Sequence, residues 1–152
     1  MAYDPYDRPA VVEDAPVAER RSVAGTSFVW SPAQIIGLLI GIFYTVMGIV
    51  SLVRTGFDTA HLDTPHIAVW HFMHSPLLGA IETAFGVLLI LAALVPGAAR
   101  SLMALLGVIA LVFGIVVLSL STPNSLRDWL AVTNRNAWLY VITGAVLVLT
   151  AV

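Results

Sequence analysis

Four long apolar runs separated by short polar segments dominate the chain. They cover residues 33–53, 76–95, 101–120 and 136–152, and Glu82 is the one charged residue within them. The first run has 21 residues, and as a helix it would extend about 31 Å, the thickness of a bilayer's hydrocarbon core. Because lipid cannot pair backbone amides, each run is expected to be helical. The pattern predicts an all-α integral membrane protein, an antiparallel four-helix bundle of four spans.

The first 27 residues follow no such pattern. They hold three prolines, five acids and three arginines, with few apolar residues in any periodic order. Such a segment cannot bury enough apolar surface to offset the entropy of ordering it. We therefore expect residues 1–27 to be a disordered cytoplasmic tail and residues 28–152 to form the transmembrane domain.

Composition agrees with a membrane location and excludes several functions. Hydrophobic residues make up 59% of the chain and charged residues 11%, whereas a soluble domain carries about 25% charged residues. The net charge of −2 offers no basic surface for nucleic acid. Since the chain contains no cysteine, disulfides and thiolate-bound metals are excluded.

Every apolar run has a glycine near its middle, followed by small or branched apolar residues. These glycines are Gly48, Gly86, Gly114 and Gly144. In lipid no hydrophobic force drives helices together, and glycine instead lets their backbones approach closely. We expect these positions at helix–helix contacts, either within one bundle or between copies of the chain.

Tryptophans and arginines indicate where the spans end. Trp30, Trp70, Trp129 and Trp138 all flank the apolar runs, as aromatic residues at a membrane interface do. Arginines near the runs divide equally between the two sides, Arg20, Arg21 and Arg100 against Arg54, Arg127 and Arg135. We expect a multi-pass protein of the plasma membrane with a cytoplasmic N-terminus, because a polar tail without a leader need not cross.

All four histidines lie between the first and second runs, at positions 61, 66, 71 and 74. If Thr64-Pro65 caps a short helix, His71 and His74 become neighbours and His66 lies nearby. His66, His71 and His74 could then bind Zn²⁺ or Cu²⁺ or act as a pH sensor. Their spacing matches no strong ligand motif, and an amphipathic interfacial segment with histidines facing water is preferred. No cofactor is expected.

Glu82 is an ionisable side chain within a span, and such residues are functional candidates because they are costly in lipid. Tyr44 and Thr45 of the antiparallel first span reach a similar depth. Glu82 is either a neutral acid hydrogen-bonded to Tyr44 or Thr45, which would hold the helices in register, or a proton or cation site. The structural interpretation is preferred.

A family resemblance rests on glycines and aromatic residues. The segments are Ala137-Trp138-Leu139-Tyr140 with Thr143-Gly144, Leu78-Gly79 and Phe85-Gly86. Over residues 33–152 the chain resembles small actinobacterial four-span membrane proteins grouped as a domain of unknown function. The resemblance implies a four-span fold and no defined active site, and it implies a histidine where this chain has Tyr140. Glu82 is also similar to the embedded glutamate of small multidrug transporters, although theirs lies on the first span.

No phosphate loop, nucleophile elbow or zinc-protease motif occurs in the chain. We therefore expect a non-enzymatic protein, a structural or accessory subunit of a larger membrane complex. The alternatives are an oligomeric proton-coupled transporter using Glu82 and a metal or pH sensor using the histidine loop. The expected partners are the lipid bilayer and either other membrane subunits or further copies of the chain.

Overall fold

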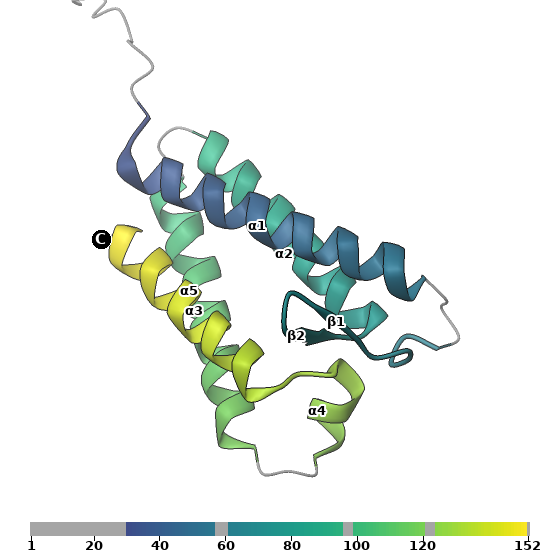
Figure 1. Ribbon diagram of the computed structural model, residues 1–152. Helices are drawn as coiled ribbons and strands as arrows, with labels where there is room; N and C mark the ends of the chain where they lie inside the picture. Colours follow the sequence, from purple (N-terminus) through teal and green to yellow (C-terminus); the bar gives the residue numbers. More distant parts are fainter. Residues whose placement is uncertain (1–29, 57–60, 96–98, 121–123, 152) are drawn as a thin grey trace, which may run out of the picture.

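A computed structural model describes residues 30–56, 61–95, 99–120 and 124–151. It is mostly helical, with five helices and one two-stranded hairpin in these ranges (Figure 1). In chain order the elements are α1 (Pro32–Thr55), β1 (Ile67–Val69), β2 (Phe72–His74), α2 (Pro76–Leu94), α3 (Ala99–Ser119), α4 (Ser125–Leu130) and α5 (Asn134–Ala151). The predicted tail of residues 1–27 lies outside the described residues.

Three helices are long and apolar enough to cross a membrane. They are α1, α2 and residues Arg100–Ser119 of α3. Their length and composition support the prediction of a membrane protein. The helix α5 coincides with the fourth expected span, but Asn134, Arg135 and Asn136 occupy its first turn and lower its hydropathy.

Side-chain caps fix where the first two helices begin. The Ser31 hydroxyl accepts a hydrogen bond from the Gln34 amide, and the Gln34 side chain accepts one from the Ser31 amide, a complete capping box. Ser75 caps α2 with its hydroxyl, which accepts a hydrogen bond from the Leu78 amide at 3.2 Å. The Gln34 side chain also donates to the Ala93 carbonyl at 2.9 Å. This bond ties the start of α1 to the end of α2.

The four long helices form two antiparallel pairs, α1 with α2 and α3 with α5, and glycines lie at the contacts of each pair. In the first pair Gly41 lies opposite Gly86 and Gly48 opposite Gly79; in the second, Gly107 lies opposite Gly144 and Gly114 opposite Ala137. A Cβ added at Gly86 would lie 2.6 Å from the Gly41 carbonyl oxygen, and one at Gly144 the same distance from that of Gly107. All four glycines singled out in the sequence are buried at such contacts.

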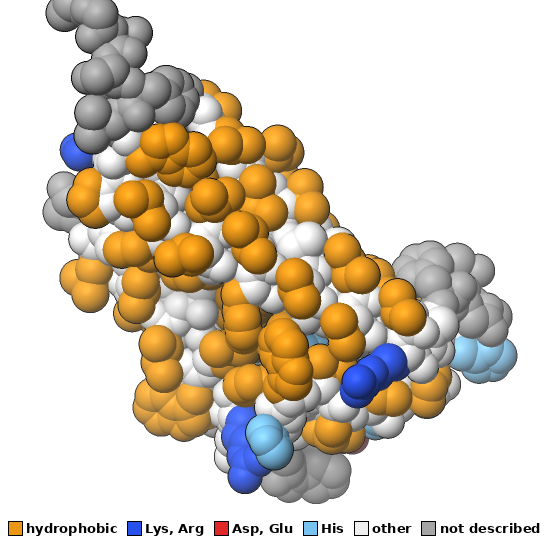
Figure 2. All heavy atoms as spheres, turned by 45° about the horizontal axis from the view of Figure 1, so that its top comes forward, with side chains coloured by type: hydrophobic (Ala, Val, Ile, Leu, Met, Phe, Trp, Pro, Cys, Tyr) orange, Lys and Arg blue, Asp and Glu red, His pale blue; other side chains and the backbone are white. Residues whose placement is uncertain are grey.

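The two helix pairs converge at one end and splay apart at the other (Figure 1). Buried Ala33, Ala92, Ala93 and Met103 pack together where the pairs converge. The β1–β2 hairpin lies between the splayed ends, and α4 lies beside it. Hydrophobic side chains cover most of the visible face of the helices, while arginine and histidine gather toward the splayed end (Figure 2).

The segment before α2 is a β-hairpin. The prediction of a short helix from Thr64-Pro65 toward His74 is therefore wrong. Ile67 pairs with His74 and Val69 with Phe72 in antiparallel register. β-branched and aromatic residues favour extended backbone, and alternate residues of a strand face opposite sides. As a result Val69 and His74 are fully buried, while His71 lies exposed in the turn.

We predict that Gly86→Ala and Gly144→Ala destabilise the protein. Each added methyl would press against backbone atoms of the partner helix, and overpacking of this kind costs about 1–3 kcal/mol. Thermal unfolding in detergent should show a lower Tm for both variants. Ala84→Leu, on the exposed side of α2, is the control and should leave the Tm near wild type. An unchanged Tm in both glycine variants would contradict close packing at these contacts.

Candidate functional site

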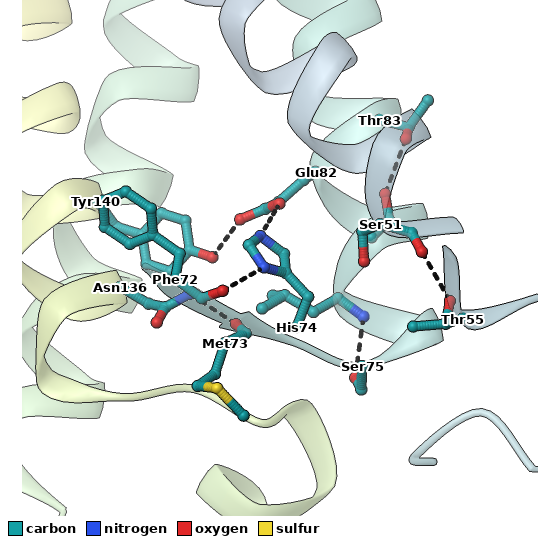
Figure 3. Close-up of polar contacts among 12 residues, drawn as sticks. Ser51, Thr55, Phe72, Met73, His74, Ser75, Glu82, Thr83, Asn136 and Tyr140 are labelled. Atoms are coloured by element: carbon teal, nitrogen blue, oxygen red, sulfur yellow. Dashed lines mark hydrogen bonds and ion pairs between the residues drawn. The ribbon is translucent and has the colours of Figure 1, made fainter. Parts of the chain in front are cut away.

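A buried polar cluster joins His74, Glu82 and Tyr140 where the hairpin meets the helices (Figure 3). The His74 Nε2 lies 2.9 Å from Glu82 Oε2. The Tyr140 hydroxyl donates to the other carboxyl oxygen, Oε1, at 2.6 Å. His74, Glu82 and Tyr140 come from β2, α2 and α5, respectively, and their exposed fractions are 0%, 2% and 5%. One carboxyl group therefore links three separate segments away from solvent.

The hydrogen bonds of His74 fix part of its protonation. Its Nδ1 lies 3.0 Å from the Phe72 carbonyl oxygen, which only accepts, so Nδ1 carries a hydrogen. A second hydrogen must lie between Nε2 and Glu82 Oε2. If it belongs to the carboxyl, both groups are neutral; if it belongs to the imidazole, they form an ion pair. In both arrangements the pair has no net charge, which limits the cost of burying it.

Local structure explains why His74 faces Glu82. Ser75 caps α2 and Pro76 begins it, so His74 lies immediately before the first helical turn. Glu82 follows six residues into α2, on the buried face with Leu78 and Gly79. The strand β2 then turns the His74 ring back over this face. The sequence signal for this contact was a histidine directly before Ser75-Pro76, the pair that begins the helix.

Tyr140 stacks on Tyr44, which is itself bonded to the same helix as Tyr140. The rings of Tyr140 and Tyr44 stack with centroids 6.1 Å apart. The Tyr44 hydroxyl is hydrogen-bonded to the Thr143 hydroxyl at 3.1 Å, one turn further along α5. Position 140 is also the one where the family resemblance implies a histidine.

These contacts correct the expected hydrogen-bond partners of Glu82. Neither Tyr44 nor Thr45 is hydrogen-bonded to it, although both lie at a similar depth on α1. Tyr44 bonds Thr143, and the Thr45 hydroxyl donates to the Gly41 carbonyl of its own helix at 2.8 Å. The acid nonetheless has buried hydrogen-bond partners, namely His74 and Tyr140.

The histidines do not form one group. His74 is buried, which contradicts its expected place at the water-facing surface, whereas His66 and His71 are exposed. Within the described residues, no three histidine, aspartate or glutamate side chains are placed to hold a metal ion. The three candidate ligands His66, His71 and His74 are therefore divided between the surface and the interior.

Asn136 adds a connection that the sequence did not suggest. Its side-chain amide donates to the Met73 carbonyl in β2 at 2.9 Å, and its oxygen accepts from the Thr133 hydroxyl at 2.6 Å. Asn136 is fully buried. The first turn of α5 is thus joined to the hairpin one residue before His74.

An apolar cavity of about 280 Å³ borders the cluster. The accessible wall is apolar throughout, because the polar atoms of Glu82 and of the two tyrosines are turned into their own hydrogen bonds. The lining residues are Tyr44, Leu78, Ile81, Glu82, Phe85, Ile109, Ala110, Phe113 and Tyr140. Ile81 and Ile109 are also exposed on the outer surface. The cavity therefore adjoins the face of α2 and α3 that lipid would cover.

We predict that Glu82→Gln keeps the fold and that Glu82→Leu weakens it. The glutamine amide can donate to His74 Nε2 while its oxygen accepts from Tyr140, whereas leucine leaves both buried partners unpaired. Each unpaired group costs about 1–3 kcal/mol. Thermal unfolding in detergent should rank the variants with glutamine near wild type and leucine well below. Equal losses for both would show that the carboxyl itself is needed for stability.

Comparisons with known proteins place the chain in a family without a described activity. The family model "Domain of unknown function (DUF4383)" matches residues 34–152. Searches of curated proteins and of solved structures gave no significant match. The matched region covers the hairpin and all of the described helices except the first two residues of α1. The chain therefore belongs to the DUF4383 family.

Proposed function

We propose that the chain is a four-span protein of the plasma membrane, with α5 as the fourth span. The start of α1 and the end of α5 would both lie on the cytoplasmic side. Two observations support the four spans. The helix α5 packs antiparallel on α3 through glycines, as α2 does on α1. The exposed tryptophans Trp70, Trp129 and Trp138 lie on the hairpin, on α4 and at the start of α5, where the opposite interface would be.

The function that the site supports best is non-enzymatic: a structural or accessory subunit of a membrane assembly. The observation that carries it is the complete internal pairing of the His74–Glu82–Tyr140 cluster. The glutamate accepts or shares hydrogens on both oxygens, and each imidazole nitrogen has a partner. A polar group satisfied in this way fixes one arrangement of hairpin and helices. The cluster would thus act as a clamp that shapes the splayed end.

The outer surface of the bundle is consistent with partners in the membrane. Between 28% and 39% of each candidate span is buried within the chain. The remaining apolar surface would contact lipid, other subunits or a second copy of this chain.

A second candidate function is proton-coupled transport by an oligomer. The cavity favours it, because Glu82 is among the residues that line it and binding sites for small molecules are lined mostly by hydrophobic and aromatic side chains. A lipophilic cation entering from the bilayer could replace the hydrogen on the carboxyl. Loss of that hydrogen would also break the hydrogen bond between His74 and Glu82, because Nε2 and the carboxylate oxygen would then both be acceptors.

Cysteine labelling tests the topology directly because the natural chain has no cysteine. With a cytoplasmic N-terminus, Ser125→Cys on α4 should react with a membrane-impermeant maleimide added to intact cells. Ser101→Cys near the start of α3 should react only after the cells are opened. Both serines are exposed, so burial does not decide the result. The reverse pattern would invert the orientation, and labelling of both outside would contradict the third span.

Reconstituted vesicles separate the two functions. If the cluster is a clamp, neither wild type nor Glu82→Gln should take up tetraphenylphosphonium in response to a pH gradient. Transport predicts gradient-driven uptake by wild type that Glu82→Gln abolishes, since an amide cannot ionise. Glu82→Asp keeps an ionisable group and is the matched control. Uptake lost in Glu82→Gln and retained in Glu82→Asp would defeat the structural proposal.

A further inference from the structure

A groove of about 620 Å³ opens at the splayed end of the helices, separate from the buried cluster. The hairpin forms one side of it, and α4, the α4–α5 connection and the start of α5 form the other. Four of its lining side chains are basic or can become so: His66, His71, Arg127 and Arg135. Asp128 is the one acid among the lining residues. Two arginines against one aspartate leave the groove with an excess of positive charge.

Arg127 is the most informative of these side chains because it is only 9% exposed. Its Nη1 donates to the Leu120 carbonyl at 3.1 Å and its Nη2 to the Asn134 side-chain oxygen, while its Nε lies 3.5 Å from the Val132 carbonyl. All three acceptors are neutral. Among the residues that the structure describes, no carboxylate forms an ion pair with Arg127. A permanent cation is therefore held in the groove wall without an ion-pair partner among the described residues, and Asp128 is the one acid that shares the groove with the two arginines.

The position of the groove indicates which anion could balance its positive charge. Trp129 on α4 and Trp138 on α5 are exposed beside it, and such rings lie at the level of lipid headgroups. The apolar surface of the helices begins at the same end (Figure 2). A phosphate carried by a lipid would reach the groove while its acyl chains remain against the apolar helix surface.

We propose that this groove binds the phosphate headgroup of an anionic phospholipid. Arg127 supplies the fixed charge in the wall, and exposed Arg135 donates hydrogen bonds to the phosphate from the start of α5. His71 faces it from the hairpin turn, where both turn residues have positive φ angles, 48° at Trp70 and 82° at His71. The turn thereby projects His71 into the groove. This site goes beyond the proposed clamp and does not depend on it.

Native mass spectrometry of the full chain in detergent tests the proposal with two lipids of equal chain length, phosphatidylglycerol and phosphatidylcholine. Wild type should bind phosphatidylglycerol more tightly, and each basic group near a phosphate is worth about fivefold in affinity. Arg135→Gln with His71→Gln should remove most of this preference. Both side chains are exposed, so these variants should fold. Arg127→Gln is avoided because it would break three hydrogen bonds.

Arg54→Gln is the matched control, since Arg54 is an exposed arginine at the end of α1 that does not line the groove. It should keep the preference for phosphatidylglycerol. Equal binding of the two lipids by wild type would overturn the proposal, as would an equal loss in the control and in the groove variant. Displacement of the lipid by inorganic phosphate would show that the groove binds a soluble anion instead.

Discussion

The hydrogen shared by His74 and Glu82 determines how the splayed end of the molecule is built. In a low-dielectric interior, a carboxylate alone or an imidazolium alone would be very costly. Together they are neutral, and Tyr140 and the Phe72 carbonyl satisfy their remaining hydrogen-bonding positions. Because the three side chains come from β2, α2 and α5, this requirement brings the hairpin between the two helix pairs. The clamp thus follows from the cost of burying a single charge, which the hairpin avoids by bringing His74 to Glu82.

Hydropathy and capping were sufficient to predict the helices. A run of about twenty apolar residues must be helical in lipid, and serine followed by proline marks two of the starts. The glycine contacts could also be predicted, because seven-residue spacing keeps glycines on one face of a helix. Helix α5 is the weaker case, because its first turn contains Asn134 and Asn136, which bond α4 and the hairpin, and the exposed Arg135, all of which lower its hydropathy.

The site was harder to predict because its contacts depend on the direction of side chains. Depth in the membrane correctly places Tyr44 near Glu82, but not which group each hydroxyl meets, and Tyr44 instead pairs with Thr143 across to α5. The histidine segment has too few residues for its period to distinguish strand from helix. Once it folds as a hairpin, alternation buries His74 and exposes His71. Asn136 gave no sequence signal, because its role depends on a hairpin carbonyl 63 residues away.

The glycine contacts also determine which motions the bundle allows. Within each pair the backbones touch at two levels, Gly41–Gly86 and Gly48–Gly79 in one and Gly107–Gly144 and Gly114–Ala137 in the other. Sliding or rolling inside a pair would bring backbone against backbone, so these contacts oppose such motions. The two pairs share fewer contacts with each other, and they meet at two places: the packed alanines of the converging end and the cluster of Tyr44, Leu78, Val117 and Tyr140. A change in the angle between the pairs would therefore have to disrupt the packing around Tyr44 and Tyr140 and the hydrogen bonds that these two tyrosines make across the pairs.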